Sequence, residues 1–222
     1  MTFSIVARAG EQFGLAIASS SPAVGARCAH ARAGIGAVAT QNVTDPALGP
    51  RILDLLAGGQ SAPQALEAVL RDNPFAAYRQ LLVIGASGVP AIYSGSHSLG
   101  THAQAAEVDA AAAGNLLSNP GVPAAMLRAF HARSGPLGER LLTALQAGVE
   151  QGGEAGPVRS AGLLIVREVA WPIVDLRVDW DRHDPVQSLQ QLWRIYAPQV
   201  DDYVNRALDP RRAPGFGVPG DP

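Results

Sequence analysis

The sequence contains no lysine, and all 17 of its basic residues are arginine. This absence excludes a Schiff-base mechanism, a Ser–Lys catalytic pair and any phosphate-binding loop that depends on a lysine. Cysteine occurs once, at Cys28, so no intrachain disulfide can form. Arg27, His30 and Arg32 could lower the pKa of Cys28, but nothing nearby resembles an assembled site, and we interpret it as a small buried thiol rather than a nucleophile.

Charge and long hydrophobic runs are also scarce. Charged residues make up 16% of the chain and the net charge is −2, which gives no electrostatic reason to expect nucleic acid or an anionic membrane as a partner. No run approaches the ~18–20 apolar residues of a membrane span, and the N-terminus lacks the pattern of a signal peptide. We therefore expect a cytoplasmic protein, and its apolar helices suit a homodimer or larger homo-oligomer.

The 222 residues, 47% of them hydrophobic, suffice for one domain with one core. The periodicity of apolar residues, together with turn and capping signals, predicts the element order. Strands are expected at 2–8, 13–19, 34–41, 80–85, 90–94, 106–112, 160–167 and 172–178, and helices at 49–57, after Ser61, and at 122–133, 137–150 and 186–207. Hairpin connections between strands predict an α+β fold of mainly antiparallel sheets with helices outside. Residues 1–208 form the domain, and 209–222 form a Pro/Gly-rich tail.

Thr2 is the first residue of the first expected strand. Because a small second residue allows removal of Met1, Thr2 can become the N-terminal residue. A threonine with a free α-amine carries a nucleophilic hydroxyl and a base, of pKa about 7.7–8.0, on one residue. Many chains lose Met1 before a threonine without any functional consequence, so this motif alone leaves catalysis open.

Two polar clusters end expected strands. The strand at 34–41 ends in the cluster Thr40, Gln41 and Asn42, and Asn115 follows Gly114 after the strand at 106–112. Their amides could donate hydrogen bonds to a substrate carbonyl or to its oxyanion. Each cluster could equally be a turn that satisfies its own hydrogen bonds.

Asp175, Arg177 and Asp179 alternate along the last expected strand and therefore share one face. We favour a solvated ion-pair ladder, and the alternative is a site that positions an amine or a substrate carboxylate. His97 and His102 lie in an expected loop without a cysteine partner or an HExxH pattern, so no metal site is predicted.

Several segments resemble a bacterial family of unknown function, DUF1028, over about residues 1–196. They are MTFSIVAR at the start, PAVGA at 22–26, ARAGIGAVATQ at 31–41, the Gly-Asn pair at 114–115, SAGLLIVRE at 160–168, VDLRVD at 174–179 and HDPV at 183–186. That family is similar to the N-terminal-nucleophile (Ntn) hydrolases. The resemblance implies a four-layer α/β/β/α sandwich and a cofactor-independent amidohydrolase that acts on a small amide, ureido or peptide-like substrate.

By the same resemblance, Thr2 is the nucleophile, and Gln41, Asn42 and Asn115 are the candidate oxyanion donors. Thr40, Asp175, Arg177 and Asp179 are the candidate substrate-binding residues. Since lysine is absent, the cation that lowers the pKa of the nucleophile has to be an arginine, with Arg177 or Arg32 as candidates. The alternative function is a non-catalytic binding or scaffold protein on the same fold.

Overall fold

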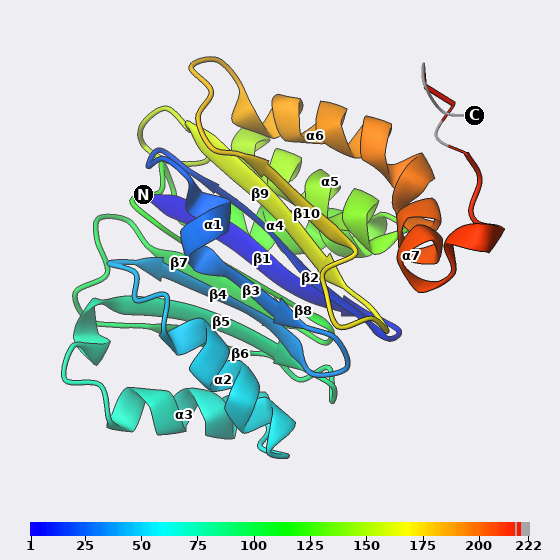
Figure 1. The fold of residues 1–222 in the computed structure, drawn as a ribbon. Helices are drawn as coiled ribbons and strands as arrows, with labels where there is room; N and C mark the ends of the chain where they lie inside the picture. Colours follow the sequence, from blue (N-terminus) through cyan, green and yellow to red (C-terminus); the bar gives the residue numbers. More distant parts are fainter. Residues whose placement is uncertain (216, 219–222) are drawn as a thin grey trace.

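Two antiparallel β-sheets packed face to face form the centre of the protein in the computed structural model, which describes residues 1–215 and 217–218 (Figure 1). The larger sheet has six strands in the order β10-β9-β2-β1-β8-β7, and the smaller has four in the order β3-β4-β5-β6. All pairings between these strands are antiparallel. The antiparallel architecture expected from the hairpin connections is confirmed.

The bounds of the elements follow the chain. The strands are β1 (Thr2–Ala9), β2 (Gln12–Ser19), β3 (Ala29–Arg32), β4 (Gly36–Asn42), β5 (Arg79–Gly85), β6 (Ala91–Ser94), β7 (Ala103–Glu107), β8 (Ala110–Asn115), β9 (Ser160–Val166) and β10 (Val174–Val178). The α-helices are α1 (Val24–Cys28), α2 (Leu48–Ala57), α3 (Ala62–Arg71), α4 (Val122–Ala132), α5 (Leu137–Glu150), α6 (Pro185–Tyr196) and α7 (Val200–Leu208). Short 3-10 helices are η1 (Ala76–Tyr78), η2 (Ala197–Gln199) and η3 (Pro210–Arg212).

Helices cover the outer face of each sheet. Helices α4, α5 and α6 lie on the six-stranded sheet, and α2 and α3 lie on the four-stranded sheet (Figure 1). Three layers of buried apolar side chains result, one under each helical layer and one between the sheets. The fold is thus the four-layer α/β/β/α sandwich that the resemblance implied.

Strand β1 presents different chemistry to its two sides. Phe3 and Ile5 are fully buried under the helices, whereas Val6 is buried between the sheets. Because side chains alternate along a strand, Thr2 and Ser4 share the Val6 face. The layer between the sheets is therefore apolar along most of β1 and polar at its beginning.

Four expectations about elements were wrong or incomplete. Neither α1 nor β3 was predicted, because each is only four or five residues long. The single strand expected at 106–112 is part of the β7–β8 hairpin, and the long helix expected at 186–207 is divided by η2, which contains Pro198. The Pro/Gly-rich tail begins with η3, and its residues 216 and 219–222 lie outside the described part.

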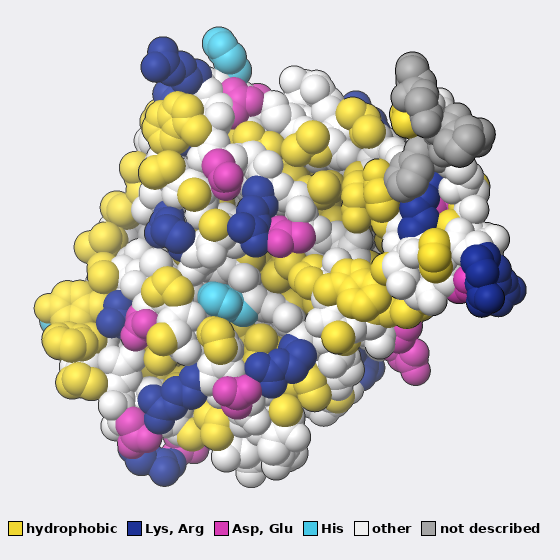
Figure 2. All heavy atoms as spheres, in the orientation of Figure 1, with side chains coloured by type: hydrophobic (Ala, Val, Ile, Leu, Met, Phe, Trp, Pro, Cys, Tyr) yellow, Lys and Arg dark blue, Asp and Glu magenta, His cyan; other side chains and the backbone are white. Residues whose placement is uncertain are grey.

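The surface carries few charges, and they are mixed in sign. On the face drawn in Figure 2, acidic and basic side chains are scattered among hydrophobic ones, and no large area of one sign forms. No helix of the described residues is long and apolar enough to cross a membrane.

Candidate active site

The ends of several strands meet where β1 begins. Thr2 is the cross-strand partner of Asn115 at the end of β8, and the Thr2 Oγ1 atom lies 3.2 Å from the Ser19 Oγ atom at the end of β2. Ser19 and Asn115 are fully buried, and Thr2 is 5% exposed. The first residue of β1 is thereby surrounded by polar side chains in the layer between the sheets.

A chain of hydroxyl groups connects Thr2 to a cation. Ser19 Oγ lies 2.8 Å from Ser21 Oγ, which accepts a hydrogen bond of 2.9 Å from Arg27 Nη2 on α1. A guanidinium can only donate, so the Ser21 hydroxyl is free to pass its own proton toward Ser19. Ser19 has a single proton, which it donates to the Met1 carbonyl in this structure. Once Met1 is absent, that proton can turn to Thr2 Oγ1, and a donor aimed at an oxygen favours its negatively charged form.

The position of Ser21 is fixed from a neighbouring strand. Ser160 Oγ, at the start of β9, donates to the Ser21 carbonyl at 2.6 Å and accepts from the Val24 amide at 3.2 Å. These bonds hold the short segment between β2 and α1 against β9. The turn after β2, which the sequence presents only as a run of serines, is therefore a built part of the site.

Met1 covers the Thr2 hydroxyl. The Met1 carbonyl oxygen accepts hydrogen bonds from both the Thr2 and the Ser19 hydroxyls. The end of the Met1 side chain lies beside Gly156, where an added Cβ would come within 3.2 Å of Met1 Cε. Removal of Met1 would therefore free two hydroxyl groups together with the space beside Gly156.

Two buried glutamines bridge the sheets next to Thr2. Gln41 Nε2 donates to the Ala113 carbonyl at 3.2 Å, and Gln80 Nε2 donates to the Gly114 carbonyl at 3.2 Å. A carbonyl can only accept, so these two bonds decide the orientation of both amides. The Gln80 Oε1 atom is left as an acceptor, and it receives Gln41 Nε2 at 2.7 Å and Asn115 Nδ2 at 3.0 Å.

We call the hydrogen-bonded side chains of Gln41, Gln80 and Asn115 the amide layer. Its bonds determine which polar groups of Gln41 and Asn115 are left to contact a substrate. Both N–H groups of Gln41 are taken, and its Oε1 atom accepts from Ser4 Oγ at 2.7 Å. Asn115 uses one N–H group on Gln80, and its Oδ1 atom is buried without a hydrogen-bond partner. The structure therefore brings both residues to Thr2, with Asn115 the less committed of the two.

Asn42 and Thr40 are placed on the other side of β4. The Asn42 amide donates to the Tyr78 and His97 carbonyls at 2.7 and 3.3 Å and accepts from the Leu99 amide at 3.1 Å, so it clamps a loop. Thr40 is fully buried on the face of Val38, toward α2 and α3, and its hydroxyl bonds Thr44 at 2.9 Å. The structure does not bring these two side chains into the layer that contains Thr2.

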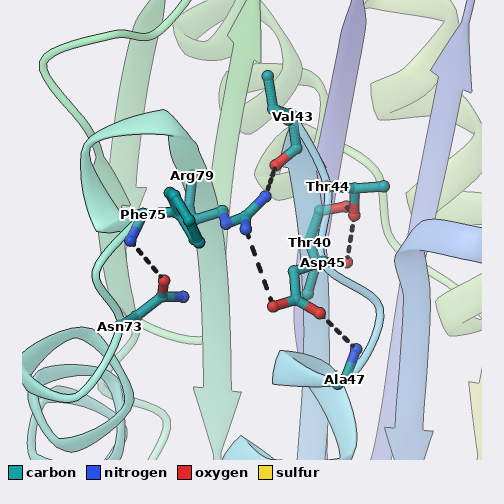
Figure 3. Close-up of polar contacts among 8 residues, drawn as sticks. All are labelled: Thr40, Val43, Thr44, Asp45, Ala47, Asn73, Phe75 and Arg79. Carbon is teal, nitrogen blue, oxygen red and sulfur yellow. Dashed lines mark hydrogen bonds and ion pairs between the residues drawn. The ribbon is translucent and has the colours of Figure 1, made fainter.

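Figure 3 shows the surroundings of Thr40. The loop after β4 folds back over the strand, and the Thr44 hydroxyl donates to the Thr40 carbonyl at 3.0 Å. Arg79 donates to the Val43 carbonyl at 2.6 Å and lies 3.9 Å from the Asp45 carboxylate. This is the self-contained turn that was one of the two interpretations of the Thr40–Asn42 cluster.

Asp175 and Arg177 pair with each other. The guanidinium donates two hydrogen bonds of 2.7 Å to the carboxylate, which confirms the favoured interpretation of an ion-pair ladder for these two residues. Strands β9 and β2 lie between β10 and β1. Asp179 follows β10, and its carbonyl accepts from the Ala23 amide at 2.9 Å. The structure does not bring these three side chains to Thr2.

The arginine that hydrogen bonds connect to Thr2 is neither of the two expected, Arg32 and Arg177. Arg32 pairs with Asp54 at 2.8 Å, and Arg177 pairs with Asp175. Arg27 is the guanidinium that the hydroxyl chain reaches. No sequence pattern pointed to Arg27, because α1, with five residues, is too short to show a helical period.

Glu154 is a buried acid that sequence reasoning missed. It is 5% exposed, it forms an isolated bridge with Leu117, and Gly152 and Gly153 before it have φ angles of 118° and 55°. Its two carboxylate oxygens accept from the Ser20 amide at 3.0 and 3.1 Å. A single acid among the three glycines of GGEAG was the available signal, since glycines permit a tight loop around it.

The direction of one peptide group locates the Glu154 carboxylate. The Ser19 carbonyl accepts from the Arg159 amide on the β9 side. Because the peptide bond between Ser19 and Ser20 is trans, the Ser20 amide points the opposite way, toward β1. The Glu154 carboxylate, which accepts from this amide, therefore lies on the β1 side of β2, near the beginning of β1. Burial raises the pKa of Glu154 to about 7, against the lowering effects of the N-terminal ammonium and the bonds from Ser20.

The remaining candidate groups lie apart from this site. The His97 ring packs against Tyr78 with a centroid distance of 4.6 Å, and His102 Nδ1 lies 3.3 Å from the Gly100 carbonyl. Within residues 1–215 and 217–218, no group of three or more His, Cys, Asp or Glu residues could hold a metal ion. Cys28 is buried, as expected, and burial raises the pKa of its thiol.

Comparisons with known proteins add a family and a fold. Residues 2–189 match the model of the family of unknown function DUF1028. The crystal structure of protein SPO2555 from Silicibacter pomeroyi, a DUF1028 structure, superposes with a TM-score of 0.83 at 29% identity, covering 90% of this chain and 94% of that one. No curated protein matches the chain.

Two further solved structures are similar to the chain at TM-scores below 0.5. Eukaryotic HslV from Trypanosoma brucei has a TM-score of 0.45 at 10% identity, covering 75% of this chain and 99% of that one. Thiobacillus denitrificans BPH in complex with epoxomicin has a TM-score of 0.38 at 14% identity, covering 74% of this chain and 97% of that one.

The amide layer predicts a stability effect. Gln80→Leu removes the acceptor of Gln41 and Asn115 and leaves buried N–H groups unpaired, so we expect a loss of about 2–3 kcal/mol in the free energy of unfolding. Urea denaturation measures it. Gln104→Leu is the matched control, because Gln104 is exposed at the edge of the same network. Equal losses of unfolding free energy in Gln80→Leu and Gln104→Leu would show that the buried amide bonds do not stabilise the fold more than an exposed one.

Glu154 predicts a pH dependence of stability. Its folded-state pKa of about 7 lies above the ordinary value of 4.5, so the folded state holds the proton more tightly. Stability is therefore fully present below about pH 4.5 and declines as the pH rises through 7, by on the order of 3 kcal/mol. Glu154→Gln keeps an acceptor for Ser20 but removes the titration.

Thermal unfolding of the wild type and Glu154→Gln from pH 4 to 9 measures this difference. The melting temperature of the variant minus that of the wild type should increase between pH 4.5 and 7. Above pH 8 this difference should stay constant. Glu11→Gln, at an exposed turn, serves as the control. Parallel curves over the whole range would show that folding does not raise the pKa of Glu154.

Proposed function

We propose that this chain, which belongs to the DUF1028 family of unknown function, is an Ntn-type hydrolase that cleaves a carbon–nitrogen bond with Thr2 as its nucleophile. The observation that carries the proposal is the donor chain from Arg27 through Ser21 and Ser19 to the Thr2 hydroxyl. The reaction needs no cofactor. Its substrate is a small amide, ureido or peptide-like compound.

Removal of Met1 supplies the base. The Thr2 α-amine takes the proton of the Thr2 hydroxyl while Oγ1 attacks the substrate carbonyl carbon, forming a C–O bond and an oxyanion. When the oxyanion collapses, the C–N bond breaks and the amine returns its proton to the leaving nitrogen. Water then hydrolyses the threonine ester, releasing the acid and restoring the hydroxyl.

Ser19 is suited to stabilise the oxyanion. Its hydroxyl donates to the Met1 carbonyl, and it loses this acceptor when Met1 leaves. A carbonyl oxygen of the substrate placed beside Thr2 would replace it. Arg27 strengthens this donor through Ser21, because bonds in such a chain polarise one another.

Asn115 is our candidate for the second oxyanion donor, since one of its N–H groups is not used by Gln80. Gln41 is better suited to position Asn115 through Gln80 than to donate to substrate. The roles proposed from the sequence for Asn42, Thr40, Asp175, Arg177 and Asp179 stay predictions. So do the cytoplasmic location and the homo-oligomeric state.

The nucleophile has a direct test. Thr2→Ala should abolish hydrolysis in a screen of small amides, ureido acids and dipeptides, whereas Thr2→Ser should keep part of it, because only serine retains a hydroxyl. Intact-mass measurement must first show that each protein is lighter by one methionine. Full activity in Thr2→Ala would end the hydrolase proposal. A wild type that keeps Met1 and cleaves nothing would favour the scaffold alternative.

The donor chain has a separate test. Ser19→Ala should lower kcat by ~10²–10³-fold, as for loss of an oxyanion donor. Arg27→Gln, which acts two hydroxyls away, should lower kcat by about tenfold, equivalent to ~1.4 kcal/mol. Arg32→Gln is the matched control, since Arg32 pairs with Asp54 outside the chain. Equal activities of the Arg27 and Arg32 variants would remove Arg27 from the mechanism.

A further inference from the structure

Met1 shows what kind of group fits beside Thr2. It is an α-amino acid residue that presents an ammonium, a carbonyl and an unbranched apolar side chain to the site at once. Its carbonyl oxygen accepts from the Thr2 and Ser19 hydroxyls, its side chain ends at Gly156, and its ammonium acts electrostatically on Glu154. Each of the three parts of the residue therefore has a matching group in the protein.

The place of Met1 is also the place that an acyl group must use. In the structure, the Met1 carbonyl carbon is bonded to the Thr2 nitrogen. In the acyl-enzyme of the proposed reaction, the substrate's carbonyl carbon is bonded to Thr2 Oγ1, which hydrogen-bonds that same Met1 carbonyl oxygen. The two acyl groups are attached to two atoms of the same residue, the Thr2 nitrogen and Thr2 Oγ1. The residues that surround the Met1 carbonyl would therefore also surround the substrate's carbonyl.

Glu154 lies on the correct side for an ammonium. Its carboxylate binds the Ser20 amide, which points toward β1, and it is therefore in line with the residue before Thr2. It is 5% exposed, and the bridge to Leu117 fixes its loop. A buried carboxylate is costly unless a cation pairs with it. A substrate ammonium placed where the Met1 ammonium stands would provide that cation.

Gly156 leaves room for a side chain. A Cβ added there would lie 3.2 Å from Met1 Cε and 3.6 Å from Met1 Sδ. Its φ angle lies outside the left-handed region, so the backbone does not require glycine at this position. The absence of a side chain at 156 therefore fits the need for space in front of Thr2.

We infer that the acyl part of the substrate is an α-aminoacyl group with a free ammonium and an unbranched apolar side chain. Glu154 binds the ammonium, Ser19 binds the carbonyl oxygen, and the space beside Gly156 receives the side chain. The inference rests on the proposed function for its chemistry. Binding to the subsite can nevertheless be measured without catalysis.

The first experiment measures binding to a protein that cannot react. Thr2→Ala, shown by intact mass to lack Met1, is titrated calorimetrically with L-methioninamide and with N-acetyl-L-methioninamide. The free amine should bind at least ~10-fold more tightly, because acetylation removes the cation that pairs with Glu154. Adding Glu154→Gln should weaken binding of L-methioninamide by a similar factor and leave N-acetyl-L-methioninamide unchanged.

The side-chain subsite has its own variant. Gly156→Val in the same background should weaken binding of L-methioninamide by at least ~10-fold and leave glycinamide unchanged, since glycinamide has no side chain to place there. Unchanged glycinamide binding also shows that the variant is folded.

The second experiment measures turnover of the same two amides by the wild type. Preferential cleavage of L-methioninamide, lost in Glu154→Gln mainly through KM, would support the inference. Equal binding of the free and acetylated amides to Thr2→Ala would overturn it. So would equal effects of Glu154→Gln on both amides, which would mean that Glu154 pairs with the Thr2 amine instead. Selective binding without turnover would defeat the proposed function and leave the aminoacyl subsite standing.

Discussion

Two hydrogen bonds from buried glutamines to backbone carbonyls of β8 determine the polar end of the sandwich. Gln41 and Gln80 belong to the four-stranded sheet, and the carbonyls of Ala113 and Gly114 belong to the six-stranded sheet. A buried amide that lost such a partner would cost about 1–3 kcal/mol. The two sheets are therefore held in one register where β1 begins, and the Asn115 amide, opposite Thr2, has one orientation.

The second constraint is the direction of the hydroxyl chain. Hydroxyl groups alone could exchange donors and acceptors freely, and then no net polarity would reach Thr2. Arg27 can only donate to Ser21, and the single Ser19 proton goes to the Met1 carbonyl, so the Ser21 proton is the one that points to Ser19. Ser160 adds to the effect by fixing the Ser21 backbone. The charge itself stays near the surface, and its influence passes inward through two serines, which avoids the cost of burying a guanidinium between the sheets.

Elements in which apolar residues recur with a clear helical or strand period were predicted from the sequence. Helix α5 occupies 137–150, as expected, and β1 extends one residue beyond the expected 2–8. The Ala-rich stretch around 103–113 has little contrast between apolar and polar positions, so its hairpin was taken for one strand. Pro198 was a recognisable helix breaker inside the expected helix at 186–207, and its effect was underestimated.

Of the residues in the candidate site, only those at or near the ends of strands were predicted from the sequence. Thr2, Gln41 and Asn115 each begin or end a strand, and antiparallel pairing brings such ends together. Ser19 ends a strand as well, but its run of serines resembles an ordinary turn. Arg27 and Glu154 come from a one-turn helix and a glycine-rich loop, and their positions depend on tertiary contacts that no local pattern encodes.

The choice of site rests on chemistry rather than on the size of a cavity. A cavity of about 460 Å³ lies at the far end of β1, lined by Arg8, Arg167 and Glu168 among others. Arg8 pairs with Asp109 at 2.9 Å and Arg167 with Asp201 at 3.0 Å, and the described residues lining the cavity include no hydroxyl or thiol. The Thr2 end has the proposed nucleophile and the hydroxyl chain to Arg27, and Met1 occupies the place beside the Thr2 hydroxyl. With Met1 in place Thr2 is only 5% exposed, so the proposed chemistry requires that Met1 be removed before a substrate can reach the Thr2 hydroxyl.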